Sequence, residues 1–245
     1  MIAAGWWAHN APRLGLILLI TGAFSLLGYA VRGVTRGGAG TGAVVCFAMF
    51  SGAGLGAFAA LLTVFALTWV ATRVGLAGKQ RMGTAERSEG RRASQVLANI
   101  GVGGLCTALY GWLGDPRLLI AMAAALSEAA ADTVSSECGQ AFGTQARLIT
   151  TFELVPAGTD GGITVRGSVC GAVAALLVGM VCVVAGLLSW RGMLIASVAG
   201  TLGSFADSYL GALLERRGWI GNDAVNFLST TIAALIAISC AAWLR

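Results

Sequence analysis

Apolar runs about as long as a membrane is thick recur along almost the whole chain of 245 residues. A helix that crosses the hydrocarbon core of a bilayer needs about 20 predominantly apolar residues. The candidate spans are residues 14–31, 42–54, 55–71, 96–114, 118–136, 168–189, 193–214 and 224–244. In a bilayer every backbone polar group must be satisfied within the protein, and a helix does this by itself. The sequence therefore predicts an all-α, polytopic transmembrane helical bundle, with residues 1–245 forming a single integral membrane domain.

The composition excludes several classes of protein. Hydrophobic residues make up 57% of the chain and charged residues only 11%, against roughly 25% charged residues in an average soluble domain. So few charged side chains exclude a soluble enzyme, a disordered chain and a nucleic-acid-binding protein. The run 14–31 is too long for the core of a cleavable signal peptide, so we interpret it as a retained helix. The six cysteines have no metal-binding spacing, and we interpret them as packing residues.

The basic residues predict how the chain crosses the membrane. We interpret residues 41–74 as two helices, which Gly52, Gly54 and Gly56 could separate, and this makes about eight spans, with six or seven as alternatives. Twelve of the 16 basic residues then lie on one side, which the positive-inside rule assigns to the cytoplasm. This side carries two long loops, about residues 75–95 and 137–167. We expect the active site at this cytoplasmic face, in one large cavity that opens to the cytoplasm and laterally to the lipid.

Acidic side chains inside the predicted spans are the first candidates for function, because a bilayer rarely tolerates them. Glu128 and Asp132 are four residues apart and share one helix face, and Asp207 lies at a similar depth in a later span. A polar packing network is the alternative, but neighbouring carboxylates repel each other unless a cation lies between them. Mg²⁺ favours one or two carboxylates together with phosphates. These three residues are the candidate catalytic groups and candidate metal ligands.

Further polar motifs collect at the same predicted face. The glycine-rich turn at residues 158–164 precedes a helix, and such turns can bind phosphate through backbone N–H groups. Arg91, Gln95 and Asn99 have four-residue spacing, so a helix would present them on one face, and arginine suits phosphate oxygens. Each of these motifs also has an ordinary explanation. The glycine-rich segment could be a simple turn, the basic residues could serve membrane topology, and Asn222 could cap a helix. The candidate nucleotide- and phosphate-binding residues are Arg91, Arg92, Gln95, Asn99, Thr159, Gly161, Gly162, Thr164, Ser208, Asn222 and Asn226.

In this order the motifs resemble those of the phytyl-phosphate kinase family of integral membrane proteins, long catalogued as a domain of unknown function. The resemblance rests on Arg-x-x-x-Gln-x-x-x-Asn at 91–99, SEAAADTVSSE at 127–137, GTDGGIT at 158–164, GSFADSYLGA at 203–212, and Asn222 with Asn226. It extends from about residue 40 to the C-terminus, and the chain is more distantly similar to CTP-dependent polyprenol kinases. Where the family often has Asn-Gly-Gly, this chain has Asp160 before its two glycines. An acid beside a phosphate-binding turn suits a metal ion, so this difference from the family adds Asp160 to the candidate metal ligands.

The resemblance implies a membrane-embedded, Mg²⁺-dependent kinase. Its reaction would transfer a phosphate from a nucleoside triphosphate, CTP rather than ATP, to an isoprenyl monophosphate such as phytyl or geranylgeranyl phosphate. The implied partners are the nucleotide, the prenyl-phosphate lipid and the membrane, with no nucleic acid. A homo-oligomer is compatible with the sequence, and in a bacterium the location would be the inner (cytoplasmic) membrane.

Two other functions stay open from the sequence alone. A proton- or cation-coupled transporter would use Glu128, Asp132 and Asp207 as a relay, but it would need a site that is reached from both faces. A scaffold or assembly factor would need no buried acids. The polar motifs gather at one predicted face, which favours the kinase.

Overall fold

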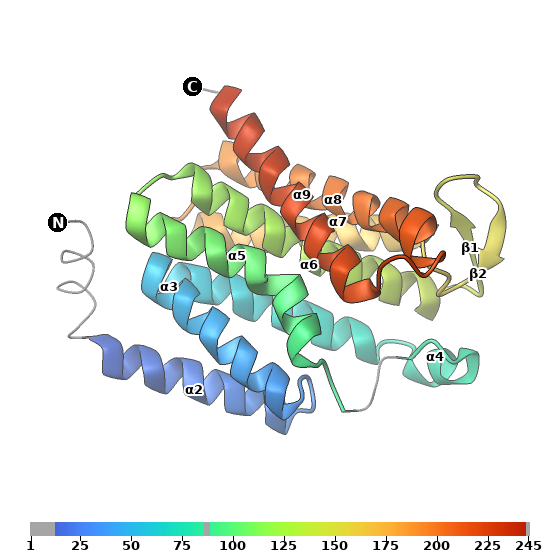
Figure 1. Ribbon diagram of the computed structural model, residues 1–245, viewed down its shortest axis with the longest axis horizontal. Helices are drawn as coiled ribbons and strands as arrows, with labels where there is room; N and C mark the ends of the chain where they lie inside the picture. Colours follow the sequence, from blue (N-terminus) through green and yellow to red (C-terminus); the bar gives the residue numbers. More distant parts are fainter. Residues whose placement is uncertain (1–12, 86–88, 244–245) are drawn as a thin grey trace.

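The computed structural model describes residues 13–85 and 89–243 of the chain (Figure 1). The helices are α2 (Leu14–Ala30), α3 (Arg36–Arg73), α4 (Leu76–Met82), α5 (Ala93–Leu113), α6 (Arg117–Ala141), α7 (Val165–Val184), α8 (Trp190–Leu210) and α9 (Asn222–Trp243). A turn of π-helix, η2 (Gly211–Glu215), continues α8. The strands are β1 (Gln145–Leu148), β2 (Leu154–Pro156) and β3 (Gly162–Ile163). The expected all-α, polytopic helical bundle is confirmed.

Helix α3 consists of two segments that meet at Gly54. Gly54 has φ 72° and ψ −159°, a conformation that is essentially restricted to glycine. The chain turns back at this glycine. As a result, the Phe50 and Phe58 rings pack with 5.6 Å between their centroids, and Phe65 lies against Gly33, just before α3 begins. With the two segments counted separately, the described residues form eight long helical segments, in agreement with the predicted spans (Figure 1).

The outer surface of the bundle is suited to lipid. Within the described residues, five helices are long and apolar enough to cross a membrane: α3, α5, α6, α7 and α9. Helix α2 is apolar but has 17 residues, and α8 has 21 residues with several polar side chains. Large apolar side chains such as Leu19, Val44 and Val184 are exposed. An aqueous protein rarely exposes apolar surface on this scale, whereas a bilayer favours it.

Helix α6 is the centre of the bundle, and most of its residues are buried. Small residues let neighbouring backbones approach it closely. A Cβ atom added at Gly200 of α8 would lie 2.6 Å from Ser127 Cβ, and one at Gly171 of α7 would lie 2.7 Å from the Ala131 carbonyl oxygen. The buried polar side chains of α6, such as Ser127 and Glu128, therefore lie inside the bundle.

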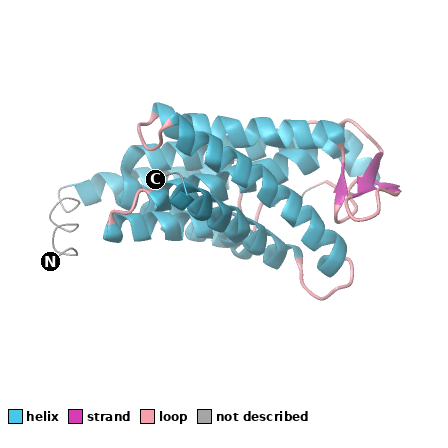
Figure 2. Cartoon of the chain, turned by 90° about the horizontal axis from the view of Figure 1, so that it is seen from above, coloured by secondary structure: helices cyan, strands magenta, loops and turns pink. Residues whose placement is uncertain are grey.

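The two predicted cytoplasmic loops carry regular structure of their own. Residues 75–95 include α4, and residues 137–167 include the end of α6 and an antiparallel sheet of order β2-β1-β3. The sheet lies at one end of the helical bundle (Figure 2). The interpretation of these segments as loops needs correction, because strands of two to four residues leave no periodic pattern in the sequence.

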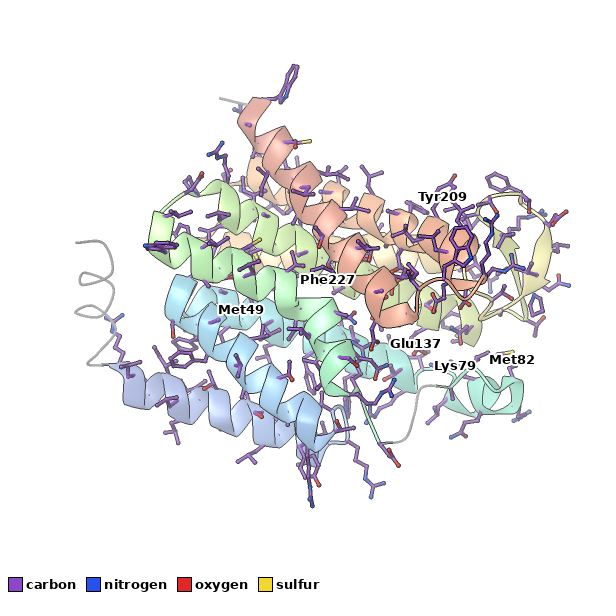
Figure 3. The ribbon with its side chains drawn as sticks, in the orientation of Figure 1. Met49, Lys79, Met82, Glu137, Tyr209 and Phe227 are labelled. Carbon is purple, nitrogen blue, oxygen red and sulfur yellow. The ribbon has the colours of Figure 1, made fainter. Side chains whose placement is uncertain are left out.

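A buried ion pair fixes α4 against α6. Lys79 Nζ pairs with the Glu137 carboxylate and also donates to the carbonyl oxygens of Ala71 and Thr72, at 3.2 and 2.9 Å (Figure 3). Lys79 is completely buried, although it lies in a segment that the sequence predicts to be a cytoplasmic loop.

The prediction that one helix presents Arg91, Gln95 and Asn99 together is wrong for Arg91. Helix α5 begins at Ala93, and Arg91 lies in the extended segment before it. The backbone of Arg91 pairs with the loop after α2, because its N–H donates to the Gly33 carbonyl oxygen at 3.0 Å. This tertiary pairing outweighs the four-residue periodicity.

Candidate active site

Three acidic side chains converge inside the bundle. Glu128 and Asp132 come from successive turns of α6, and Asp207 comes from the C-terminal half of α8. Electrostatic interactions connect the three carboxyl groups. Ser229 of α9 donates a hydrogen bond to Asp207, with 3.1 Å between Ser229 Oγ and Asp207 Oδ2. The structure therefore brings together, from α6 and α8, the three acids that the sequence places in the site, and α9 adds Ser229.

Glu128 is the most deeply buried of the three, with 1% of its surface exposed. Among the described residues its Oε1 atom has no hydrogen-bond partner. A buried carboxylate oxygen without a partner is costly, because burial removes the water that would otherwise solvate it. This oxygen is therefore suited to a cation, and it distinguishes the cluster from a satisfied packing network.

A positive charge reaches the acidic cluster from the segment before α5. Arg91 Nη2 donates to Thr133 Oγ1 over 3.2 Å, and its guanidinium interacts electrostatically with Asp132. Arg91 therefore lies beside the acids despite its unexpected backbone position. A guanidinium there can bind phosphate oxygens in a bidentate manner.

A polar cavity of about 130 Å³ lies next to the acids. Asp132 and Asp207 line it from the bundle, and Glu215 lines it from the end of α8. The predicted residues that also line it are Thr159, Asp160, Gly161, Gly162, Thr164, Ser208 and Asn222. The acidic cluster and the glycine-rich turn, which are separated in the sequence, thus face one cavity.

The glycine-rich turn packs directly on α8. Gly161 has φ 76°, and a Cβ atom there would lie 2.5 Å from Ala212 Cβ and 2.7 Å from the Ser208 carbonyl oxygen. The turn leads into α7, whose first turn is capped by Thr164 Oγ1 accepting from the Gly167 N–H at 3.0 Å. Helix N-termini carry partial positive charge, which favours phosphate groups. The local structure therefore fits phosphate binding, with the Thr164 side chain serving as a helix cap.

Five of the predicted phosphate-binding residues do not line the polar cavity as the described residues define it: Arg91, Arg92, Gln95, Asn99 and Asn226. Arg92 is exposed, and its N–H donates to Gln95 Oε1 at 2.9 Å, so Gln95 caps the start of α5. Asn99 is buried and donates to the Gln95 carbonyl oxygen at 2.8 Å. Asn226 is buried one turn before Ser229.

Sequence reasoning missed Ser229 and Glu215. Ser229 is a buried polar residue in an apolar span, three positions after Asn226, and this helical spacing was the available signal. Glu215 lies eight residues, or about two turns, after Asp207. Burial and the negative charges of Asp160, Asp132 and Asp223 raise the pKa of the Glu215 carboxyl to about 7.

The acidic side chains of the site are compatible with Mg²⁺ if a phosphate group supplies some of the metal ligands. Within the described residues, no three His, Cys, Asp or Glu side chains are placed to hold a metal ion by themselves. Mg²⁺ commonly binds through one or two carboxylates, with substrate phosphates and water as its other ligands. Asp132 and Asp207 face the cavity as such a pair. The residues therefore fit Mg²⁺ that binds together with a phosphate ligand.

The fold and the buried polar site define a polytopic integral membrane protein. Residues 19–234 match the family described as integral membrane protein DUF92, and the chain belongs to this family. The family resemblance predicted from the motifs and the membrane location predicted from the apolar runs are thereby confirmed.

Relatives of the chain occur in archaea, cyanobacteria and plants. A membrane protein of Methanocaldococcus jannaschii is 36% identical over 181 residues, which cover 73% of each chain. A membrane protein of Synechocystis is 29% identical over 233 residues, covering 93% of this chain and 90% of the relative. The chloroplastic protein VTE6 of Arabidopsis thaliana is 27% identical over 194 residues, covering 76% of this chain and 58% of VTE6. No solved structure matches the chain.

Proposed function

We propose that the protein is a membrane-embedded kinase that transfers a phosphate from a nucleoside triphosphate to an isoprenyl monophosphate. The observation that carries the proposal is the convergence of Glu128, Asp132 and Asp207 beside the glycine-rich turn and the N-terminus of α7. Carboxylates suit a divalent cation, and the turn and helix N-terminus suit phosphate. The motif resemblance supports phytyl or geranylgeranyl phosphate as the phosphate acceptor, and CTP rather than ATP as the phosphate donor.

The proposed reaction needs no general base. An oxygen of the lipid monophosphate attacks the γ-phosphorus, and a new P–O bond forms as the bond to the β–γ bridging oxygen breaks. The nucleoside diphosphate leaves with that electron pair. A phosphate monoester is already ionised near neutral pH, since its second pKa is about 6, so no proton has to be removed first. The protein therefore contributes by positioning two phosphates and compensating their charge.

Each part of the site has a role in this scheme. The N–H groups of the glycine-rich turn and the first turn of α7 hold the nucleotide phosphates, and Ser208 and Asn222 add polar contacts around the cavity. Asp132 and Asp207 hold Mg²⁺, and Glu128 supports them from the buried side. Mg²⁺ when bound compensates the phosphate charge. Asp160 also lines the cavity and is a further candidate ligand.

A cation-coupled transporter is the second candidate. The observation in its favour is the buried, unpartnered Oε1 of Glu128 beside two further acids. The position of the polar cavity next to the turn and sheet at one end of the bundle favours the kinase.

One experiment separates the two functions. The purified protein is incubated in lipid nanodiscs with Mg²⁺, γ-labelled CTP or ATP, and prenyl alcohols or prenyl monophosphates. We expect label in the lipid with a monophosphate acceptor and none with Asp132→Asn. Absence of labelled lipid with every pair, together with cation flux in liposomes that Asp132→Asn abolishes, would replace the kinase with the transporter.

A further inference from the structure

A second cavity, of about 330 Å³, lies between α2, both segments of α3 and the start of α5. Its walls are largely apolar, and the large side chains that line it are Phe24, Leu61, Val64, Phe65, Trp69 and Ile100. Its volume falls at the lower end of the range for small-molecule sites, roughly 300–1,000 Å³. The cavity is therefore large enough for an apolar ligand of modest width.

Packing maintains the cavity as a stable feature of the fold. The Phe24 ring of α2 contacts the Phe58 and Phe65 rings of α3 edge to face, with 5.4 Å between centroids in each pair. The lining residues of the first α3 segment are small: Gly38, Ala39 and Gly42. Large aromatic side chains from α2 and the second α3 segment, combined with small residues from the first, leave space between these helices.

One end of this apolar cavity is cationic. Arg32 follows α2, Arg73 ends α3 and Arg91 precedes α5, and all three line the cavity at the end of the helices nearest the acidic cluster. The Arg73 guanidinium lies over the Trp69 ring at 3.7 Å and donates to the Val31 carbonyl oxygen at 3.1 Å, so its charge is held in place. An apolar cavity with a cationic end complements an amphiphile that has an anionic head.

Arg91 connects the two cavities. It lines the apolar cavity, while its guanidinium donates to Thr133 and interacts with Asp132, and Asp132 lines the polar cavity. A phosphate bound by Arg91 from the apolar side would therefore lie beside the carboxylate that faces the nucleotide phosphates.

We propose that the apolar cavity binds the hydrocarbon chain of a single-chain isoprenyl phosphate, with the lipid phosphate at Arg91. This assignment rests on the proposed kinase function and adds the position of the lipid substrate. It also assigns Arg91 to the lipid phosphate, whereas the sequence motif predicts a nucleotide contact. Lipid and nucleotide enter separate cavities, and their phosphates meet between Arg91 and Asp132.

The position of the chain is tested by photolabelling that needs no turnover. The probe is a geranylgeranyl phosphate analogue with a diazirine at the end of its chain, added to the protein in nanodiscs without nucleotide. We expect mass spectrometry to find label on peptides that contain Phe24 or Phe65, and unlabelled geranylgeranyl phosphate to compete with it. Labelling confined to the outer helix surfaces, or equal competition by two-chain phosphatidic acid, overturns the proposal.

A matched pair of variants tests whether the cavity itself is used. Gly42 lines the cavity, and a Cβ atom there would have only Val96 within 4.0 Å, whereas Gly40 on the same helix faces open space. Gly42→Phe should reduce labelling by about tenfold and shift turnover towards shorter prenyl chains, while Gly40→Phe changes neither. Equal effects of the two variants, or full labelling of Gly42→Phe, overturn the proposal.

A second pair tests the position of the phosphate. Arg91→Ala should raise the KM for prenyl phosphate roughly ten- to a hundred-fold and change the nucleotide KM much less, and the exposed Arg81→Ala should change neither. A larger effect of Arg91→Ala on the nucleotide KM overturns the assignment. Cavity labelling without kinase activity would support lipid binding and contradict only the kinase, whereas an active enzyme labelled elsewhere would contradict only the cavity.

Discussion

Ser229 of α9 donates a hydrogen bond to Asp207 of α8, with 3.1 Å between the hydroxyl and carboxylate oxygens. Ser229 is completely buried, and the carbonyl oxygen of Asn226 lies at the same 3.1 Å from its hydroxyl. The hydroxyl has one proton for two acceptors, and a charged acceptor makes the stronger hydrogen bond. A residue outside the acidic helices therefore orients one of the three acids.

We expect Ser229→Ala to lower kcat by roughly ten- to a hundred-fold, because hydrogen bonds to charged groups contribute about 1.5–3 kcal/mol. Ser239→Ala is the matched control, since Ser239 lies on the same helix and is exposed. Steady-state kinetics on both variants checks this. Equal rates for the two variants would remove Ser229 from the site.

Charge neutralisation at the acids should separate activity from stability. We expect Glu128→Gln and Asp132→Asn each to lower turnover at least about a hundred-fold, because several kcal/mol of charge stabilisation would be lost. The thermal unfolding midpoint should stay the same or rise, because each change removes repulsion between like charges. A near-normal rate of either variant at saturating Mg²⁺ would show that the ligand assignment is wrong.

The sequence predicted the features that depend on local patterns. Apolar runs gave the spans and the break at Gly54, and the scarcity of acids in membranes singled out Glu128, Asp132 and Asp207. These signals are strong because lipid excludes charge and unpaired backbone from most positions. The glycine-rich turn was also found, since Gly161 has a positive φ that few other residues adopt easily.

Features that depend on distant contacts could not be predicted. Arg91 pairs with the loop after α2, and nothing local in its sequence indicates that partner. Lys79 is buried and pairs with Glu137, which lies 58 residues further along the chain, so no local pattern indicates its burial. One large cavity was expected, but the structure separates a polar cavity from an apolar one, because the hairpin at Gly54 places Phe65 opposite Phe24.

Gly161→Ala tests the contact between the turn and α8. We expect a rise in the nucleotide KM and a loss of about 1–3 kcal/mol in stability, because the new methyl group would meet Ala212 and Ser208. Gly218→Ala is the control: Gly218 also has a positive φ, 70°, but open space around its Cβ position. Thermal unfolding and KM measurements on both variants separate crowding from backbone strain. Equal changes in stability and KM for the two variants would mean that backbone strain at the positive φ, and not contact with α8, causes the loss.

The buried pair of Lys79 and Glu137 should stabilise the packing of α4 only while both partners are present. Lys79→Met leaves the Glu137 carboxylate buried without its partner, and we expect a loss of about 3 kcal/mol in the free energy of unfolding. Lys79→Met combined with Glu137→Leu should recover most of this loss. The free energy of unfolding, measured in detergent for the single and double variants, checks this expectation, and Arg81→Met at an exposed arginine is the control. A double variant less stable than Lys79→Met would contradict it.

Glu215 should make stability depend on pH. Burial and the neighbouring acids raise its pKa from 4.5 to about 7 in the folded protein, so between these values the folded state binds more protons than the unfolded state. Stability contributed by this group is therefore present at low pH and lost as the pH rises from about 4.5 to about 7. Glu215→Gln cannot ionise, so it should match the wild type near pH 5 and have the higher unfolding midpoint at pH 8.

The measurement is thermal unfolding of both proteins between pH 5 and pH 8 in EDTA, because a divalent cation near Asp160 or Asp132 would offset the repulsion that raises this pKa. The other acids are the same in both proteins, so the difference between the two curves isolates Glu215. Adding Mg²⁺ with the nucleotide should shrink this difference, since Glu215 lines the cavity where both are proposed to bind. Parallel curves at all pH values would show that Glu215 ionises normally and that its carboxylate is not under the influence of the cavity acids.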